Sequence, residues 1–154
     1  MIKVNVILHN ILWKKYLKNP RQFIETRINL LNKKNNTHKN KHLICTLLLS
    51  DTKEIKKLNK KFRNKDKSTD VLSFPFYSKK QLVSKIKIQN EIYIGDIILN
   101  LAKVKNKKNQ IKFKEEFNKL WIHGLIHLFG YKHTKNKDFF KMNKLEKKFY
   151  DYLS

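Results

Sequence analysis

The sequence predicts an α/β or α+β fold built on one β-sheet, in a single domain that spans residues 1–154. Segments with the two-residue period of strands are interleaved with segments of helical period. The chain has only three glycines and two prolines, and no stretch has the composition of a flexible linker. A chain of this length can bury most of the surface that it exposes when unfolded.

The first part of the chain is expected to form a strand, a helix and a second strand. Residues 2–8 alternate apolar with polar side chains, which is typical of a half-buried strand. Asn19 followed by Pro20 is a favourable helix start, because proline is tolerated at the first helical position. Residues 32–41 are polar and lysine-rich and predict a solvated loop, and the apolar run 42–49 predicts a buried strand. The apolar face of the helix is formed by Phe23, Ile24, Ile28 and Leu31.

A second helix and a short strand are expected next. Asp51 and Glu54 have the spacing of a helix-capping pair. Residues 69–76 predict a loop that passes into a short strand, which Pro75 ends or confines to a sheet edge. The second helix is expected from the helical spacing of Ile55, Leu58 and Phe62.

The segment that follows is expected to be less regular. Residues 79–90 are interpreted as a variable hairpin or loop. Residues 91–99 predict another strand, which Gly95 and Asp96 interrupt as a β-bulge does. A helix is then expected through residues 101–104.

Two helices are expected at the C-terminal end. At about 100° per residue, residues 113–129 present one apolar arc. His123 and His127 fall within about 60° of Leu120, at the edge of that arc. They are therefore expected at the rim of the core, where a cleft can form. The last helix has an apolar face at Met142, Leu145, Phe149 and Tyr152.

The charge of the chain points to a polyanionic partner. The formal net charge is +24, from 36 basic and 12 acidic residues. Such self-repulsion is tolerable mainly when the protein works on a polyanion, and nucleic acid is the usual one. Only three of the basic residues are arginines, and lysine suits non-specific phosphate attraction better than base reading. The abundance of Lys, Asn and Ile also has a simpler explanation, an AT-rich genome.

The remaining composition indicates a cytoplasmic chain. No apolar run approaches the ~20 residues of a membrane span. The N-terminus alternates in polarity and lacks the apolar core of a signal peptide. The single cysteine, Cys45, excludes an internal disulfide, and its position in an apolar run predicts a small core residue.

Three of the six histidines lie within residues 123–133. His123 and His127 are four residues apart and project from one face of a helix. Gly130 can end that helix, so that His133 can fold back toward the other two. Three neutral imidazoles suit zinc or a similar divalent ion and leave a fourth position for water. The alternative is a set of satisfied core or surface histidines without a metal.

This spacing also occurs in metzincin proteases, whose pattern places Glu directly after the first histidine. Gly124 occupies that position here, so the general base for peptide hydrolysis is missing. Glu116 lies on the same helical stripe, but two turns before His123, which is too far to replace that base. The sequence therefore disfavours a protease.

From about Leu58 to Leu153, the chain resembles the bacterial YbeY endoribonucleases, which are metal-dependent factors in ribosomal RNA maturation. The resemblance is carried by the segment from Leu58–Asn59 to Arg63, the segment 69–75, Gly95-Asp96-Ile97, and the segment from His123 to His133. It implies a mixed sheet flanked by helices with the metal in a basic cleft, one Zn²⁺ per chain held by His123, His127 and His133, and Arg63 as the active-site arginine.

One residue departs from the family pattern. The family usually has Asp directly before the third histidine, whereas this chain has Lys132. If that Asp orients a metal ligand, its loss weakens metal binding. If it is a solvated turn residue, Lys132 adds a phosphate contact.

Zinc and the Arg63 guanidinium are expected to stabilise the negative charge of a phosphodiester transition state together. Asp70 and Asp96 are candidates to hold a histidine N–H, with loop capping as the alternative for each. Base stacking is a candidate role for Phe74, Phe76 and Tyr77, with core packing as the alternative.

Two functions remain open at this stage. The first is a single-strand-specific, zinc-dependent endoribonuclease in ribosomal RNA processing and ribosome quality control, with RNA and the ribosome or its proteins as partners. The second is a zinc-stabilised RNA-binding ribosome assembly factor with little catalytic activity. A fourth protein ligand, such as His9 or His42, would favour the second function.

Overall fold

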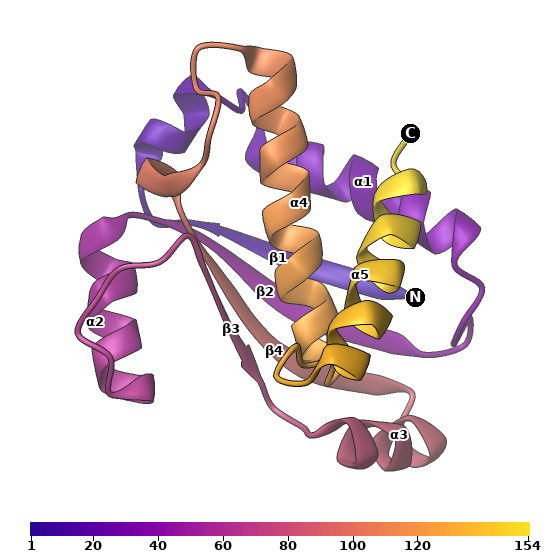
Figure 1. The fold of residues 1–154 in the computed structure, drawn as a ribbon. Helices are drawn as coiled ribbons and strands as arrows, with labels where there is room; N and C mark the ends of the chain where they lie inside the picture. The colour runs from indigo at the N-terminus through magenta and orange to yellow at the C-terminus, as the bar shows by residue number, and fades with distance from the viewer.

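The computed structural model describes residues 1–154 and shows one sheet with helices on both faces (Figure 1). This confirms the α+β fold with a single mixed sheet. The strands are β1 (Ile2–Leu8), β2 (His42–Ser50), β3 (Val71–Pro75) and β4 (Glu91–Asn100). The α-helices are α1 (Pro20–Lys34), α2 (Thr52–Arg63), α3 (Lys79–Ile88), α4 (Gln110–Leu128) and α5 (Asn136–Asp151), and two short 3₁₀ turns are η1 (Ile11–Lys15) and η2 (Leu101–Lys103).

The strands are arranged in the order β1-β2-β4-β3. The first three are parallel, and β3 pairs antiparallel with β4 at the edge. The expected bulge is present, because the pairing of β2 with β4 shifts between Ile44 and Cys45, where Gly95 adopts φ +137°. A Cβ atom at Gly95 would collide with the carbonyl oxygen of Phe74, so the close pairing of β3 with β4 at this position requires glycine.

The two faces of the sheet bury cores of different size. The larger core lies between the sheet and α1, α4 and α5, and it contains Trp13, Trp121 and Phe117. On the opposite face, α2 covers a small cluster of Ile55, Leu72 and Ile98. Figure 1 shows α2 and α4 on either side of β3, so this edge strand separates the two layers.

The expected helix starts are confirmed at two caps. The Asn19 side chain accepts the Gln22 N–H, with Pro20 in the first turn of α1. The Asp51 carboxylate accepts the Glu54 N–H at the start of α2.

Two segments differ from the expectation. Residues 79–90, expected as a hairpin or loop, contain α3, which begins with a capping box between Ser78 and Gln81 and buries Leu82. The helix expected through residues 101–104 is only the single turn η2. After the buried Val104, residues 105–109 are lysines and asparagines, which offer no apolar face with which to extend the turn.

Candidate metal centre

Helix α4 positions the first two histidines at the rim of the core. Its apolar face, which includes Phe117, Trp121 and Leu125, is buried against the sheet. His123 and His127 lie at the side of this face and are half-buried, as the helical angles predict. A Cβ at Gly124 would lie 2.6 Å from a side-chain carbon of Ile97 on β4, so glycine at this position lets the helix turn between the two histidines lie directly on the sheet.

The turn after α4 returns the third histidine. Gly130 has φ +88°, and its N–H donates to the carbonyl of His127 at the end of the helix. A Cβ at Gly130 would lie 2.6 Å from the Cα of Lys79, so both the backbone angle and the close approach of α3 require glycine. This tight reversal brings His133 beside the helix.

The three histidines form one cluster, as the spacing predicts. Their ligand nitrogens lie within 4.8 Å of one another, and no Cys, Asp or Glu belongs to the group. The Nε2 atoms of His123 and His127 are 3.0 Å apart. The ring of His133 lies 5.1 Å from that of His127 and 5.7 Å from that of His123, measured between centroids. His9 and His42 lie outside this group.

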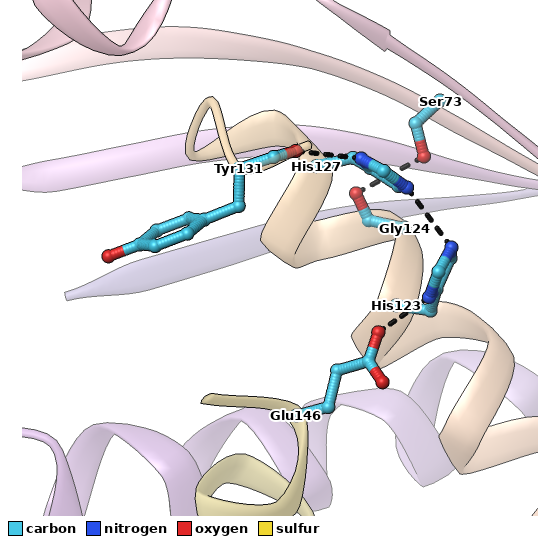
Figure 2. Close-up of polar contacts among 6 residues, drawn as sticks. All are labelled: Ser73, His123, Gly124, His127, Tyr131 and Glu146. Atoms are coloured by element: carbon cyan, nitrogen blue, oxygen red, sulfur yellow. Dashed lines mark hydrogen bonds and ion pairs between the residues drawn. The ribbon is translucent and has the colours of Figure 1, made fainter. Parts of the chain in front are cut away.

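The other ring nitrogen of each helical histidine has a hydrogen-bond acceptor (Figure 2). The Nδ1 of His123 lies 2.5 Å from a carboxylate oxygen of Glu146 on α5. The Nδ1 of His127 lies 2.8 Å from the backbone carbonyl of Tyr131. Because the carbonyl accepts only, and the carboxylate accepts when ionised, each Nδ1 carries the proton and donates it.

This arrangement fits a cation. If both rings carry their proton on Nδ1 only, the Nε2 lone pairs of His123 and His127 face each other at 3.0 Å. That contact is repulsive unless a positive charge lies nearby. Histidine ligands in metal sites characteristically donate their second N–H to a carboxylate or a carbonyl. The residues present therefore match a divalent ion such as zinc.

Electrostatics also favour the neutral, ligating form of His127. Burial lowers its pKa, and the positive charges that His123 and His133 would carry act in the same direction, while the hydrogen bond to the Tyr131 carbonyl opposes them. At neutral pH this imidazole therefore has a free lone pair.

The aspartates proposed from the sequence do not contact the histidines. Asp70 accepts the Val71 N–H at the start of β3, which is the loop-capping alternative. Asp96 accepts the hydroxyl of Tyr93 on the face of the sheet opposite α4. The carboxylate on His123 is instead Glu146, which the sequence reasoning missed. Its one local signal is position: it is an acidic residue beside the predicted core residue Leu145, on a helix rich in lysine.

Arg63 is the last residue of α2, and it approaches β3 from the side opposite α4. Its guanidinium donates to the backbone carbonyl of Ser73 at 3.0 Å. The hydroxyl of Ser73 donates in turn to the carbonyl of Gly124, between the two helical histidines, at 3.2 Å (Figure 2). One residue of the edge strand thus connects Arg63 with the turn of α4 that carries His123 and His127.

Lys132 has an exposed side chain. Glu146 and the Tyr131 carbonyl already hold the second nitrogens of those two ligands. The loss of an aspartate at position 132 therefore leaves the hydrogen bonds of both helical histidines intact.

A family model described as "Endoribonuclease YbeY" matches residues 9–154. The chain belongs to the YbeY family. It is 40% identical to "Endoribonuclease YbeY" of Pelagibacter ubique, over 99% of this chain and 97% of that one. The protein of the same description from a Sulfurihydrogenibium strain is 33% identical, over 92% and 84% of the two chains. A solution structure from Thermotoga maritima superposes with a TM-score of 0.57 at 27% identity, covering 99% of this chain and 89% of that one.

Proposed function

We propose that this YbeY-family chain is a zinc-dependent endoribonuclease that cleaves single-stranded RNA and acts in ribosomal RNA maturation. The endoribonuclease description of its relatives supports the reaction class. The observation that carries the proposal is the cluster of His123, His127 and His133, with two Nε2 atoms turned toward each other and both Nδ1 atoms held. This cluster is the proposed binding site for one Zn²⁺ per chain.

In the proposed reaction, different groups bind the metal, orient its ligands and bind the phosphate. His123, His127 and His133 would hold a zinc ion, which when bound would supply a Lewis acid for a phosphoryl oxygen and would lower the pKa of bound water toward ~7. Glu146 and the Tyr131 carbonyl fix the rings of His123 and His127. The Arg63 guanidinium, one residue of β3 away from the metal-binding turn, can grip two phosphate oxygens in its planar fork.

The charge of the chain supports an RNA substrate. A net charge of +24 attracts phosphates at long range and independently of sequence. None of the helices combines the length and the apolar composition that a membrane crossing requires. We infer that the protein acts in the cytoplasm, on ribosomal RNA or on the ribosome.

The composition of the metal group supports catalysis over a purely structural zinc. Structural zinc sites are closed by four protein ligands, whereas catalytic sites keep one position for water or substrate. The group here has three protein donors. The second hypothesis, a zinc-stabilised RNA-binding assembly factor, is therefore the less supported of the two.

The test pairs metal analysis with RNA cleavage for the wild type, His127→Ala and a matched control, His9→Ala. His9 is exposed and lies outside the metal group. We expect one zinc per chain and cleavage of single-stranded RNA for the wild type and for His9→Ala, and loss of both for His127→Ala. A His127→Ala protein that is folded, free of zinc and fully active would refute the proposal.

A further inference from the structure

Two aromatic pairs lie on the face of the sheet that carries α2. Phe62 packs edge-on against Phe74, with ring centroids 5.4 Å apart. Phe76 packs against Tyr93 at 5.1 Å. The side chains of Phe62 and Phe76 are 60% and 57% exposed. Single exposed phenylalanines are ordinary on a protein surface, but here each packs beside a second ring, and Phe74 and Phe76 are two residues apart along the edge of the sheet, which places the two pairs on one face.

Each exposed ring is held by a partner that is fixed in the fold. Phe74 packs on the small core of Ile55, Leu72 and Ile98. Tyr93 is fixed by its hydroxyl, which donates to Asp96 and also contacts the Thr46 hydroxyl. Tyr77, a third candidate for base stacking beside Phe74 and Phe76, packs instead against the main core on the other side of the sheet. The aromatic surface therefore consists of Phe62, Phe74, Phe76 and Tyr93.

Cations flank this surface. The Arg63 guanidinium carbon lies 5.7 Å from the centre of the Phe74 ring, and the Lys61 ammonium lies 5.3 Å from that of Phe62. Helix α2 also carries Lys53, Lys56, Lys57 and Lys60, against Glu54 on the helix and Asp66 in the loop after it, which pairs with Lys56 and Lys60. On the sheet beneath, the Asp96 carboxylate accepts the hydroxyl of Tyr93. The charge of this region thus matches a polyanion with flat, apolar groups.

The aromatic surface is continuous with the metal centre. Arg63 lies beside Phe74 and donates to the carbonyl of Ser73, and Ser73 contacts Gly124 of α4. In Figure 1 the C-terminal ends of α2 and α4 lie near the same end of β3, on either side of it. A bound polymer that crosses the edge strand at Ser73 therefore passes from the aromatic rings toward the histidines.

We propose that Phe62, Phe74, Phe76 and Tyr93 form a base-stacking surface for an unpaired RNA strand, which crosses β3 at Arg63 to reach the metal centre. This rests on the proposed function, and it accounts for the preference for single strands. Bases expose their faces to aromatic rings only when they are unpaired. Stacking does not depend on the RNA sequence, since every base has such a face. This agrees with the lysine-rich composition of the protein, because lysines bind phosphates and do not distinguish bases.

The test measures RNA binding by fluorescence anisotropy with the full chain, so that it does not depend on cleavage. The probes are a single-stranded oligoribonucleotide and an abasic strand of the same length. The variants are Phe62→Ala and Phe76→Ala, with Phe76→Trp to restore a ring. Ile111→Ala, at a 72% exposed position in the first turn of α4, is the control for loss of exposed apolar surface.

We expect each alanine variant to bind the single strand about 5- to 100-fold more weakly, in line with the loss of one stacked base. Affinity for the abasic strand should be unchanged, and Phe76→Trp should bind like the wild type. Unchanged affinity of both alanine variants would overturn the proposal and would indicate a protein partner for this surface. An equal loss on the abasic strand would also overturn it. Absence of cleavage by the wild type, with the stacking effect intact, would count against the proposed function alone.

Discussion

Replacement of Glu146 by Gln is expected to weaken zinc binding about 10-fold. The Glu146 carboxylate accepts the Nδ1–H of His123 at 2.5 Å, and the two side chains are only 28% and 32% exposed. A hydrogen bond to a charged group contributes about 1.5–3 kcal/mol, against about 0.5–1.5 for a neutral one. The glutamine oxygen can still accept the proton, so the variant loses about 1–1.5 kcal/mol, which corresponds to roughly 10-fold in affinity. This agrees with the 10–100-fold range typical of residues that hold metal-ligating histidines.

The affinity is measured by competition with a chromophoric zinc chelator at pH 7. Glu116→Gln is the matched control, because Glu116 is also partly buried and also pairs with a cation, Lys119, but lies two turns before His123 on α4. We expect the control to bind zinc like the wild type. Wild-type zinc affinity in a folded Glu146→Gln protein would refute the view that this carboxylate supports the metal ligand.

Three further outcomes are expected. Arg63→Lys should retain zinc and most RNA affinity but lose roughly 10²–10³ in cleavage rate, because an ammonium cannot grip two phosphate oxygens at once; wild-type cleavage would show that the guanidinium geometry is irrelevant. Asp51→Ala should lower the free energy of unfolding by about 1 kcal/mol at pH 7, since it removes the cap of α2. The hydrogen bond from the Glu54 N–H lowers the pKa of the Asp51 carboxyl, so the stability that this carboxylate contributes is present above the unfolded pKa of ~3.9 and is lost as the pH falls below that value. In denaturant titrations, the difference in unfolding free energy between the wild type and Asp51→Ala should therefore be smaller at pH 3 than at pH 7. Burial raises the pKa of the Cys45 thiol to about 12, so the native protein should react with a thiol reagent only after unfolding, and rapid labelling of the native chain would contradict the fold.

The cluster of three histidines could be predicted because its geometry is local. The spacing of His123 and His127 depends only on the helical period, and the position of His133 depends on a glycine that ends the helix. The strands and the capped helices followed from the same kind of short-range pattern. The capping box of Ser78 and Gln81 was an equally local signal of α3, and the sequence analysis overlooked it.

The residues that support the ligands could not be predicted in this way. Glu146 is 23 residues from His123, and only the packing of α5 on α4 brings the two together. Asp96 was wrongly considered beside the histidines, because the direction of its side chain depends on the register across the bulge. The bulge turns Asp96 toward Tyr93 and away from the metal centre. Such contacts are decided by tertiary packing, which a single sequence does not reveal.

The central claim is that His123, His127 and His133 hold one zinc ion with a position left for water or phosphate. Zinc K-edge X-ray absorption of the purified full chain tests it most directly. We expect three nitrogen ligands at about 2.0–2.1 Å, with the remaining ligand a light oxygen donor. We also expect the nitrogen contribution to fall in His127→Ala protein. A spectrum with a sulfur ligand, or an all-oxygen shell unchanged in His127→Ala, would contradict the account.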